Sequence, residues 1–197
     1  MNFLAHIYLS QSIDAFMLGN FMADSIKGNQ YLQYPSPIKE GILMHRFIDA
    51  YTDSHPKVLE NIQLLRPQYG KYASIVSDIV YDHFLAKNFE FYANVSLQVF
   101  VNEVYRFMEM NDKDATPFIQ EVIPIMQKYN WLENYQYKEG LQKIFCQFGR
   151  RIKVDTMFDN VTEVVWTDYE IFEENFTSFF PEIKMACESK KSELFTL

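Results

Sequence analysis

The sequence predicts an all-α protein, a single-domain helical bundle spanning residues 1–197, on the strength of three observations. Apolar residues recur every three to four positions, as in Tyr72, Val76, Val80 and Phe84. Strand-like alternation is not sustained anywhere, and only 6 Gly and 7 Pro interrupt the chain, so long helices are favoured over many short strands. No linker divides the chain, and a chain of this length can bury a substantial core.

Capping and turn residues predict where the first helices begin and end. Asn2 is available to cap a short first helix, and Ser12 is expected to cap the second. Gly28 is expected to end the second helix and to open a loop. Ser36 and Pro37 then read as the N-cap and first position of the third helix.

Proline residues set most of the later boundaries. Pro56 suits the first turn of the fourth helix, Pro67 is expected to end it, and Pro181 is expected to break the last helix. The predicted helices cover residues 3–7, 13–27, 37–53, 56–65, 68–88, 96–110, 116–128, 137–150 and 161–189.

Composition and charge exclude several classes of protein. With 48% hydrophobic and 17% aromatic residues the chain is not disordered, and an aromatic-rich core is expected. A net charge of −8 argues against nucleic acid and anionic membranes as partners. Cys146 and Cys187 form no metal-binding pattern, which predicts reduced thiols and a cytoplasmic protein. No apolar run approaches the roughly 20 residues of a membrane helix.

The third predicted helix contains a polar stripe on an otherwise apolar surface. His45, Asp49 and Asp53 recur at four-residue spacing in the segment GILMHRFIDAYTD, so they fall within about 80° of one another around the helix. Gly41 lies one turn before His45 and is expected to leave this stripe open. Asp53 is the end of the stripe, where a surface role is as plausible as a role near a ligand.

Further histidine and aspartate side chains interrupt other apolar helices. They are His6, Asp24, Asp82 and His83. Imidazole nitrogen and carboxylate oxygen, without thiolate, suit manganese, iron, zinc or magnesium, and helices of a bundle can bring such ligands to one interior point. A metal there would activate water and neutralise charge on a phosphoryl oxygen. The alternative, local hydrogen bonds between histidines and aspartates, stays open on spacing alone.

Basic residues are few in this acidic chain, which makes their positions informative. Arg46 directly follows His45, and Lys27 follows Asp24 by three residues, so both are candidates to contact a phosphate. Arg150 and Arg151, with Lys153, form the densest positive cluster. That cluster is either a docking patch or a helix C-terminus stabilised by cations.

Four segments carry a resemblance to a known family. They are MNFLAHIYLS at residues 1–10, GNFMADSIKG at 19–28, GILMHRFIDAYTD at 41–53 and DIVYDHFLAKNF at 78–89. In order and spacing they resemble the acyl carrier protein phosphodiesterases, described as divergent members of the HD-domain phosphohydrolases. The segment FGRRIKVD at 148–155 is similar to a paired-arginine stretch of that family. Tyr8 and Ser25 depart from its pattern.

The resemblance implies an HD-like helical fold and hydrolysis, typically with Mn²⁺, that removes 4′-phosphopantetheine from a serine of holo-acyl carrier protein. Fe²⁺, Mg²⁺ and Zn²⁺ are the alternatives to Mn²⁺. On the family's histidine and aspartate positions, we expect Asp24, His45, Asp49 and Asp82 to bind the metal, and His6 or His83 to protonate the leaving group. Arg46 and Lys27 would hold phosphate oxygens. Arg150 and Arg151 would dock the acidic carrier protein.

Two other functions remain open from the sequence. One is a helical metallophosphohydrolase for a small substrate such as a nucleotide, which would need no protein-docking patch. The other is a non-catalytic binder of carrier protein, in which the polar stripes only hydrogen-bond one another. The oligomeric state does not follow from the sequence.

Overall fold

The computed structural model describes residues 1–154 and 156–196, and within them the chain forms α-helices, short 3-10 helices and no strand. The predicted all-α class is therefore confirmed. Asp155, the last residue of the FGRRIKVD segment, and Leu197 lie outside the described residues. The α-helices are α1 Phe3–Leu9, α2 Ala15–Met22, α3 Ile38–Ser54, α4 Pro56–Tyr69, α5 Ala73–Lys87, α6 Phe89–Tyr92, α7 Leu97–Met110, α8 Pro117–Lys128, α9 Trp131–Asn134, α10 Lys138–Arg151, α11 Val161–Thr167 and α12 Tyr169–Thr196. The 3-10 helices are η1 Ala23–Ser25, η2 Gly28–Gln33, η3 Gly70–Tyr72 and η4 Asp112–Asp114.

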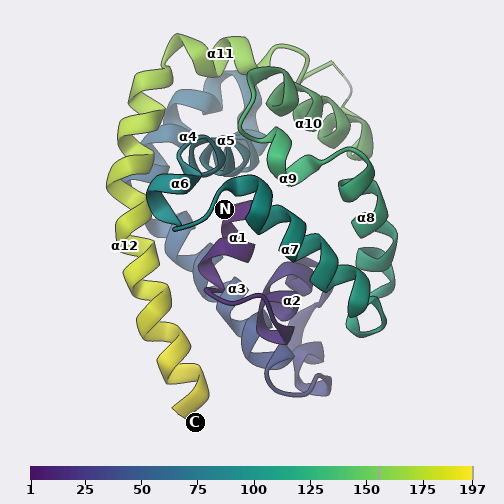
Figure 1. The fold of residues 1–197 in the computed structure, drawn as a ribbon. Helices are drawn as coiled ribbons and strands as arrows, with labels where there is room; N and C mark the ends of the chain where they lie inside the picture. The colour runs from purple at the N-terminus through teal and green to yellow at the C-terminus, as the bar shows by residue number, and fades with distance from the viewer. Residues whose placement is uncertain (155, 197) are drawn as a thin grey trace.

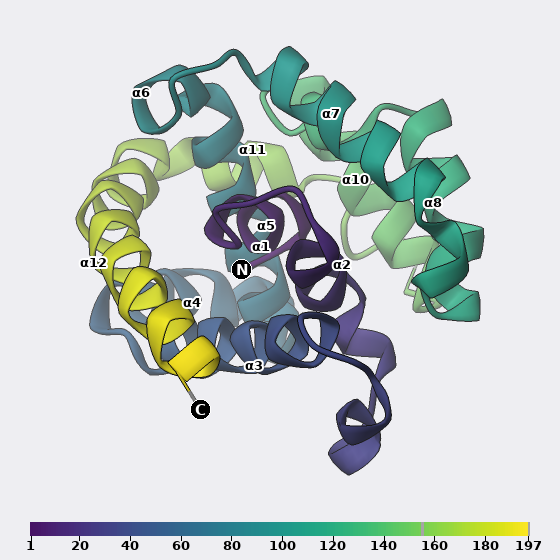
Figure 2. The ribbon, with the colours of Figure 1, turned by 60° about the horizontal axis from the view of Figure 1, so that its bottom comes forward.

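Helices α1 and α5 lie near the centre of the molecule (Figure 2). The long α12 packs against α3, α4 and α5 along one side, while α7, α8 and α10 lie on the other side (Figure 1). Buried aromatic residues fill the space between α5 and α12, where Tyr81 contacts Phe176 and Phe179. The central position of α1 and α5 gives their side chains access to the interior, which is where His6 is found.

Two glycines allow α2 and α3 to pack with their backbones in contact. A Cβ atom on Gly41 would lie 2.0 Å from the main-chain oxygen of Phe16, and one on Gly19 would lie 2.1 Å from that of Ile38. Only glycine fits at such an approach. The prediction that Gly41 leaves the polar stripe open was wrong, because the space at Gly41 is filled by the backbone of α2.

Several helix boundaries differ from the predicted ones. Asp14, and not Ser12, caps α2, since its carboxylate accepts hydrogen bonds from the main-chain N–H groups of Phe16 and Met17. The second helix also ends early, at Met22, and the expected loop after Gly28 contains the 3-10 helix η2.

The predicted proline breaks were wrong. Pro67 lies inside α4 and Pro181 lies inside α12, whereas the last predicted helix is interrupted at Asp168. A proline inside a helix costs about 3 kcal/mol. Helix α12 offsets that cost by burying a row of side chains around Pro181, which includes Phe179, Phe180 and Ile183.

None of the described helices combines the length and the apolar character needed to span a membrane.

Candidate metal centre and its cavity

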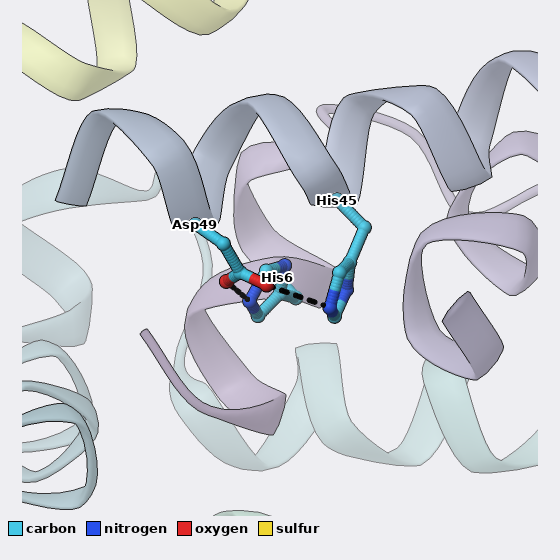
Figure 3. A group of neighbouring side chains, drawn as sticks. All are labelled: His6, His45 and Asp49. Carbon is cyan, nitrogen blue, oxygen red and sulfur yellow. Dashed lines mark ion pairs between the residues drawn. The ribbon is translucent and has the colours of Figure 1, made fainter. Parts of the chain in front are cut away.

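A cavity of about 640 Å³ lies between α1, α3 and α5 on one side and α8, α9 and α10 on the other. His6, Asp24, His45 and Asp49 all line it. One possible ligand atom from each of His6, His45 and Asp49 lies within 4.8 Å of the other two, a spacing that could hold a metal ion. Figure 3 shows the two imidazole rings and the Asp49 carboxylate pointing toward one another.

Asp49 bridges the two histidines through its two carboxylate oxygens. Its carboxylate oxygens are 3.2 Å from Nε2 of His6 and 3.1 Å from Nε2 of His45. The rings of His6 and His45 are stacked with their centroids 4.0 Å apart. Helix α1 supplies His6, and one turn of α3 separates His45 from Asp49, so the four-residue spacing brings the second pair together without help from the tertiary fold.

Asp24 adds a second carboxylate from the 3-10 helix η1. One of its oxygens is 3.2 Å from Nε2 of His45. Its side chain remains largely exposed, unlike the two histidines, which are buried. Residues of α1, η1 and α3, three segments that are separate in the sequence, therefore converge on this group.

Asn20 orients both histidines, a role that sequence reasoning missed. Its side-chain oxygen is 2.9 Å from Nδ1 of His6, and its main-chain oxygen is 2.8 Å from Nδ1 of His45. Its amide nitrogen donates to the main-chain oxygen of His6 and to Ser10, which fixes the orientation of the amide. Because a carbonyl oxygen only accepts, both rings carry hydrogen on Nδ1 and turn Nε2 toward the carboxylates. The sequence did carry a signal for this role, because Asn20 is a polar residue one turn before Asp24 in an otherwise apolar segment.

The protonation states follow from these contacts. Burial lowers the pKa of His45, but hydrogen bonds to Asp24 and Asp49 outweigh it and raise this pKa to about 9. Burial and the charge of His45 lower the pKa of His6 to about 4, although Asp49 acts in the opposite direction. Burial raises the pKa of Asp49, yet the hydrogen bond from His45 and the contact with His6 hold it well below its usual range. At neutral pH His6 is uncharged and Asp49 is ionised.

These residues fit a divalent cation. Nε2 of neutral His6 and the ionised Asp49 carboxylate are both acceptors, yet they face each other at 3.2 Å. A cation bound by both groups removes this conflict, and it also takes the place of the extra proton on His45. Two imidazole nitrogens with carboxylate oxygens form a donor set that suits manganese, iron or zinc.

Asp82 lies apart from this group and supports it indirectly. Its fully buried carboxylate accepts hydrogen bonds from the main-chain N–H groups of Asn2, Leu4 and Ala5, at 3.3, 2.7 and 3.2 Å. Those donors are the otherwise unpaired groups at the start of α1. The carboxylate therefore caps the helix that carries His6. The predicted cap, Asn2, makes no side-chain capping hydrogen bond.

His83 is also directed away from the cavity. Its Nδ1 is 2.7 Å from the main-chain oxygen of Tyr135, and its Nε2 is 2.9 Å from the hydroxyl of Tyr169. Lys87 donates to the same hydroxyl. Both ring nitrogens are used in this buried network, and His83 is not among the residues that line the cavity.

The predicted basic residues separate in the structure. Arg46 donates to the main-chain oxygen of Gly28 at 2.7 Å and packs on the ring of Tyr31, so it holds η2 in place instead of facing the cavity. Lys27 and Arg150 are exposed and do not line the cavity. Arg151 does line it, with its guanidinium over the ring of Phe148.

The two departures from the family pattern have local roles. Tyr8 donates a hydrogen bond to the main-chain oxygen of Tyr92 and is not among the residues that line the cavity. Ser25 lines the cavity, and its hydroxyl is 2.8 Å from that of Thr116, which connects η1 to the residue before α8.

Comparison with known proteins confirms the resemblance carried by the four segments. A family model described as acyl carrier protein phosphodiesterase matches residues 1–183. The acyl carrier protein phosphodiesterase of Enterobacter sp. (strain 638) is 31% identical over 193 residues, which cover 97% of this chain and 100% of that protein. The corresponding protein of Klebsiella pneumoniae (strain 342) is 33% identical over 196 residues, covering 97% and 100%. That of Salmonella agona (strain SL483) is 32% identical over 198 residues, covering 98% and 100%. No solved structure matches the chain. The chain belongs to the acyl carrier protein phosphodiesterase family.

Proposed function

We propose that the protein is a metal-dependent phosphodiesterase that removes 4′-phosphopantetheine from holo-acyl carrier protein. The observation that carries this proposal is the convergence of His6, His45 and Asp49 on one cavity in a chain of this family. Hydrolysis adds the oxygen of water to phosphorus and breaks the bond from phosphorus to the serine oxygen, which takes up a proton. The products are apo-acyl carrier protein and 4′-phosphopantetheine.

The acidity of the cavity supports a role for a metal. Its lining includes the carboxylates of Asp24, Asp49 and Asp53, besides that of Asp78, which pairs with the N-terminal ammonium group at 2.9 Å, and a phosphodiester is an anion. Such a substrate is repelled unless a cation lies between it and the carboxylates. We propose Mn²⁺ in this role, with Fe²⁺, Mg²⁺ or Zn²⁺ as alternatives, held by His6, His45, Asp49 and Asp24. When bound, the metal would supply positive charge to the phosphoryl oxygens and make water more acidic.

The protein's own residues prepare the site before substrate arrives. Asn20 holds both imidazoles with Nε2 directed at Asp49, so little reorganisation is needed for ligation. Asp82 keeps α1, and with it His6, in position. Arg151 is the member of the predicted basic set that reaches the cavity, where it would contact the phosphate or the acidic surface of the carrier protein.

One assay tests the function. The purified protein is incubated with holo-acyl carrier protein and each of the four metals in turn, and intact masses are measured. We expect loss of 4′-phosphopantetheine with at least one metal, and a loss of activity of at least 100-fold in His45→Gln. His55→Gln is the matched control, because His55 contacts Glu182 outside the cavity and should turn over normally.

Two results would replace the proposal with another function. No loss of the prosthetic group with any metal would reject the phosphodiesterase. Turnover of nucleotides without turnover of holo-acyl carrier protein would support the small-substrate phosphohydrolase.

A further inference from the structure

The cavity extends well beyond the His6, His45 and Asp49 group. Its far wall is built by α8, α9 and α10 and consists of Phe118, Ile119, Trp131, Ile144, Gln147 and Phe148, which we call the α8–α10 wall. The total volume of about 640 Å³ is in the range of pockets that enclose a whole small molecule, roughly 300–1,000 Å³. A phosphodiester group alone occupies only a small part of it. The wall therefore has room for the chain attached to the phosphate.

Two polar atoms in the α8–α10 wall lack partners. Within residues 1–154 and 156–196, neither the indole nitrogen of Trp131 nor the side-chain oxygen of Gln147 has a hydrogen-bond partner, and both atoms are shielded from solvent. One is a donor and the other an acceptor. Their neighbours in the wall are aliphatic and aromatic. Polar atoms left unpaired in such surroundings are costly, so a ligand that pairs with them gains affinity and specificity.

We propose that the α8–α10 wall binds the pantetheine arm of the substrate by its amides. This inference rests on the proposed function and names the part of the substrate that the far side of the cavity holds. A secondary amide presents a C=O that accepts from Trp131 and an N–H that donates to Gln147, which is the complement of the two unpaired atoms. The proposal requires each of these side chains, both of which line the cavity, to turn its polar atom to the cavity surface. With the phosphate at the His6 and His45 end, the arm lies along the apolar wall.

The chain has only two tryptophans, which makes a direct test available. A ¹⁵N-labelled sample should show two indole N–H resonances, one from Trp131 and one from Trp166. Trp166 packs against His83 and Tyr169 and does not line the cavity, so it serves as an internal control. The probe is pantetheine, which has the amides but no phosphate and so needs no metal.

We expect pantetheine to shift the Trp131 indole resonance in a saturable manner and to leave that of Trp166 in place. Octanol, an apolar probe without an amide, should not move the Trp131 resonance in the same direction. The inference is overturned if pantetheine produces no saturable shift of Trp131, or if octanol reproduces it. A nucleotide that shifts Trp131 where pantetheine does not would assign the wall to base stacking instead.

A substitution provides the second measurement. Gln147→Leu removes the acceptor at similar volume and should weaken pantetheine binding at least fivefold, whereas Gln98→Leu, at an exposed position of α7, should leave it unchanged. Unchanged binding in Gln147→Leu overturns the inference, and the Trp131 shift in the wild type decides the matter if this variant does not fold. Pantetheine binding without cleavage of holo-acyl carrier protein would reject the function and keep the subsite. Cleavage of holo-acyl carrier protein without the Trp131 shift would keep the function and reject the subsite.

Discussion

Replacing Gly41 by alanine is expected to destabilise the protein, whereas helix propensity alone predicts that it stabilises it. Gly41 lies inside α3, where a Gly→Ala change normally stabilises a helix by about 1 kcal/mol. In this protein the added Cβ atom would lie 2.0 Å from the main-chain oxygen of Phe16 and 2.9 Å from the main-chain nitrogen of Asn20. Both obstacles are backbone atoms, so no side-chain rotation relieves the overlap.

The required movement also reaches the candidate metal centre. Opening the contact with Phe16 from 2.0 Å to the 3.0 Å minimum that Cβ atoms tolerate separates α2 and α3 by about 1 Å. The hydrogen bond from Nδ1 of His45, one turn along α3, to the main-chain oxygen of Asn20 is 2.8 Å long and crosses the same interface. A displacement of about 1 Å takes it beyond hydrogen-bonding distance. His45 then loses the contact that directs its Nε2 at Asp49.

The net effect is the difference between three contributions. Overpacking destabilises the protein by about 1–3 kcal/mol and the lost hydrogen bond by about 1 kcal/mol. The higher helix propensity of alanine stabilises it by about 1 kcal/mol. We therefore expect Gly41→Ala to lower the free energy of unfolding by about 1–3 kcal/mol and to weaken Mn²⁺ binding about tenfold.

Urea unfolding and calorimetric titration with Mn²⁺ measure the two effects. Ala50→Leu is the control, because Ala50 is on the exposed face of the same helix and should change stability by no more than about 0.5 kcal/mol. If Gly41→Ala proves as stable as the wild type, the close approach of α2 and α3 and its coupling to His45 are refuted.

Three further predictions follow from the contacts around the site. Asn20→Leu removes the acceptor for Nδ1–H of His6 and should weaken Mn²⁺ binding about tenfold, with ¹⁵N spectra showing more of the other His6 tautomer; an unchanged affinity would exclude the orienting role. Asp82→Ala leaves main-chain N–H groups at the start of α1 unpaired and should lower the free energy of unfolding by about 1–3 kcal/mol. Asp82→Asn should cost less, and if it instead abolished Mn²⁺ binding at full stability, Asp82 would be a metal ligand. The metal-free protein should lose stability as pH rises from 6.5 to about 9, because the folded state holds the His45 proton more tightly than the unfolded state does. Urea unfolding across that range would show it, and the same slope in His45→Gln would assign the effect to another group.

Local sequence determined much of the fold and, within the candidate metal centre, the pairing of His45 with Asp49. Residues one helical turn apart face the same way in any α-helix, so the spacing of His45 and Asp49 was enough to pair them. Apolar periodicity likewise predicted α3, α5, α7, α8 and α10 within a few residues of where they lie. These features depend on contacts between near neighbours in the chain, which is why a single sequence reveals them.

Tertiary structure decided what the remaining polar residues do. Asp82, His83 and Arg46 each carry a group suited to a phosphohydrolase site, yet each is committed to a partner elsewhere: the start of α1, Tyr135 with Tyr169, and the carbonyl of Gly28. The helix break at Asp168, in place of Pro181, has the same origin, since burial along α12 outweighs a local proline preference. A buried polar group must find a partner, and which one it finds depends on how distant segments pack. The sequence by itself determined that histidines and aspartates enter an apolar interior, and only the packing of α1, α2 and α3 decided that His6, Asn20, His45 and Asp49 meet there.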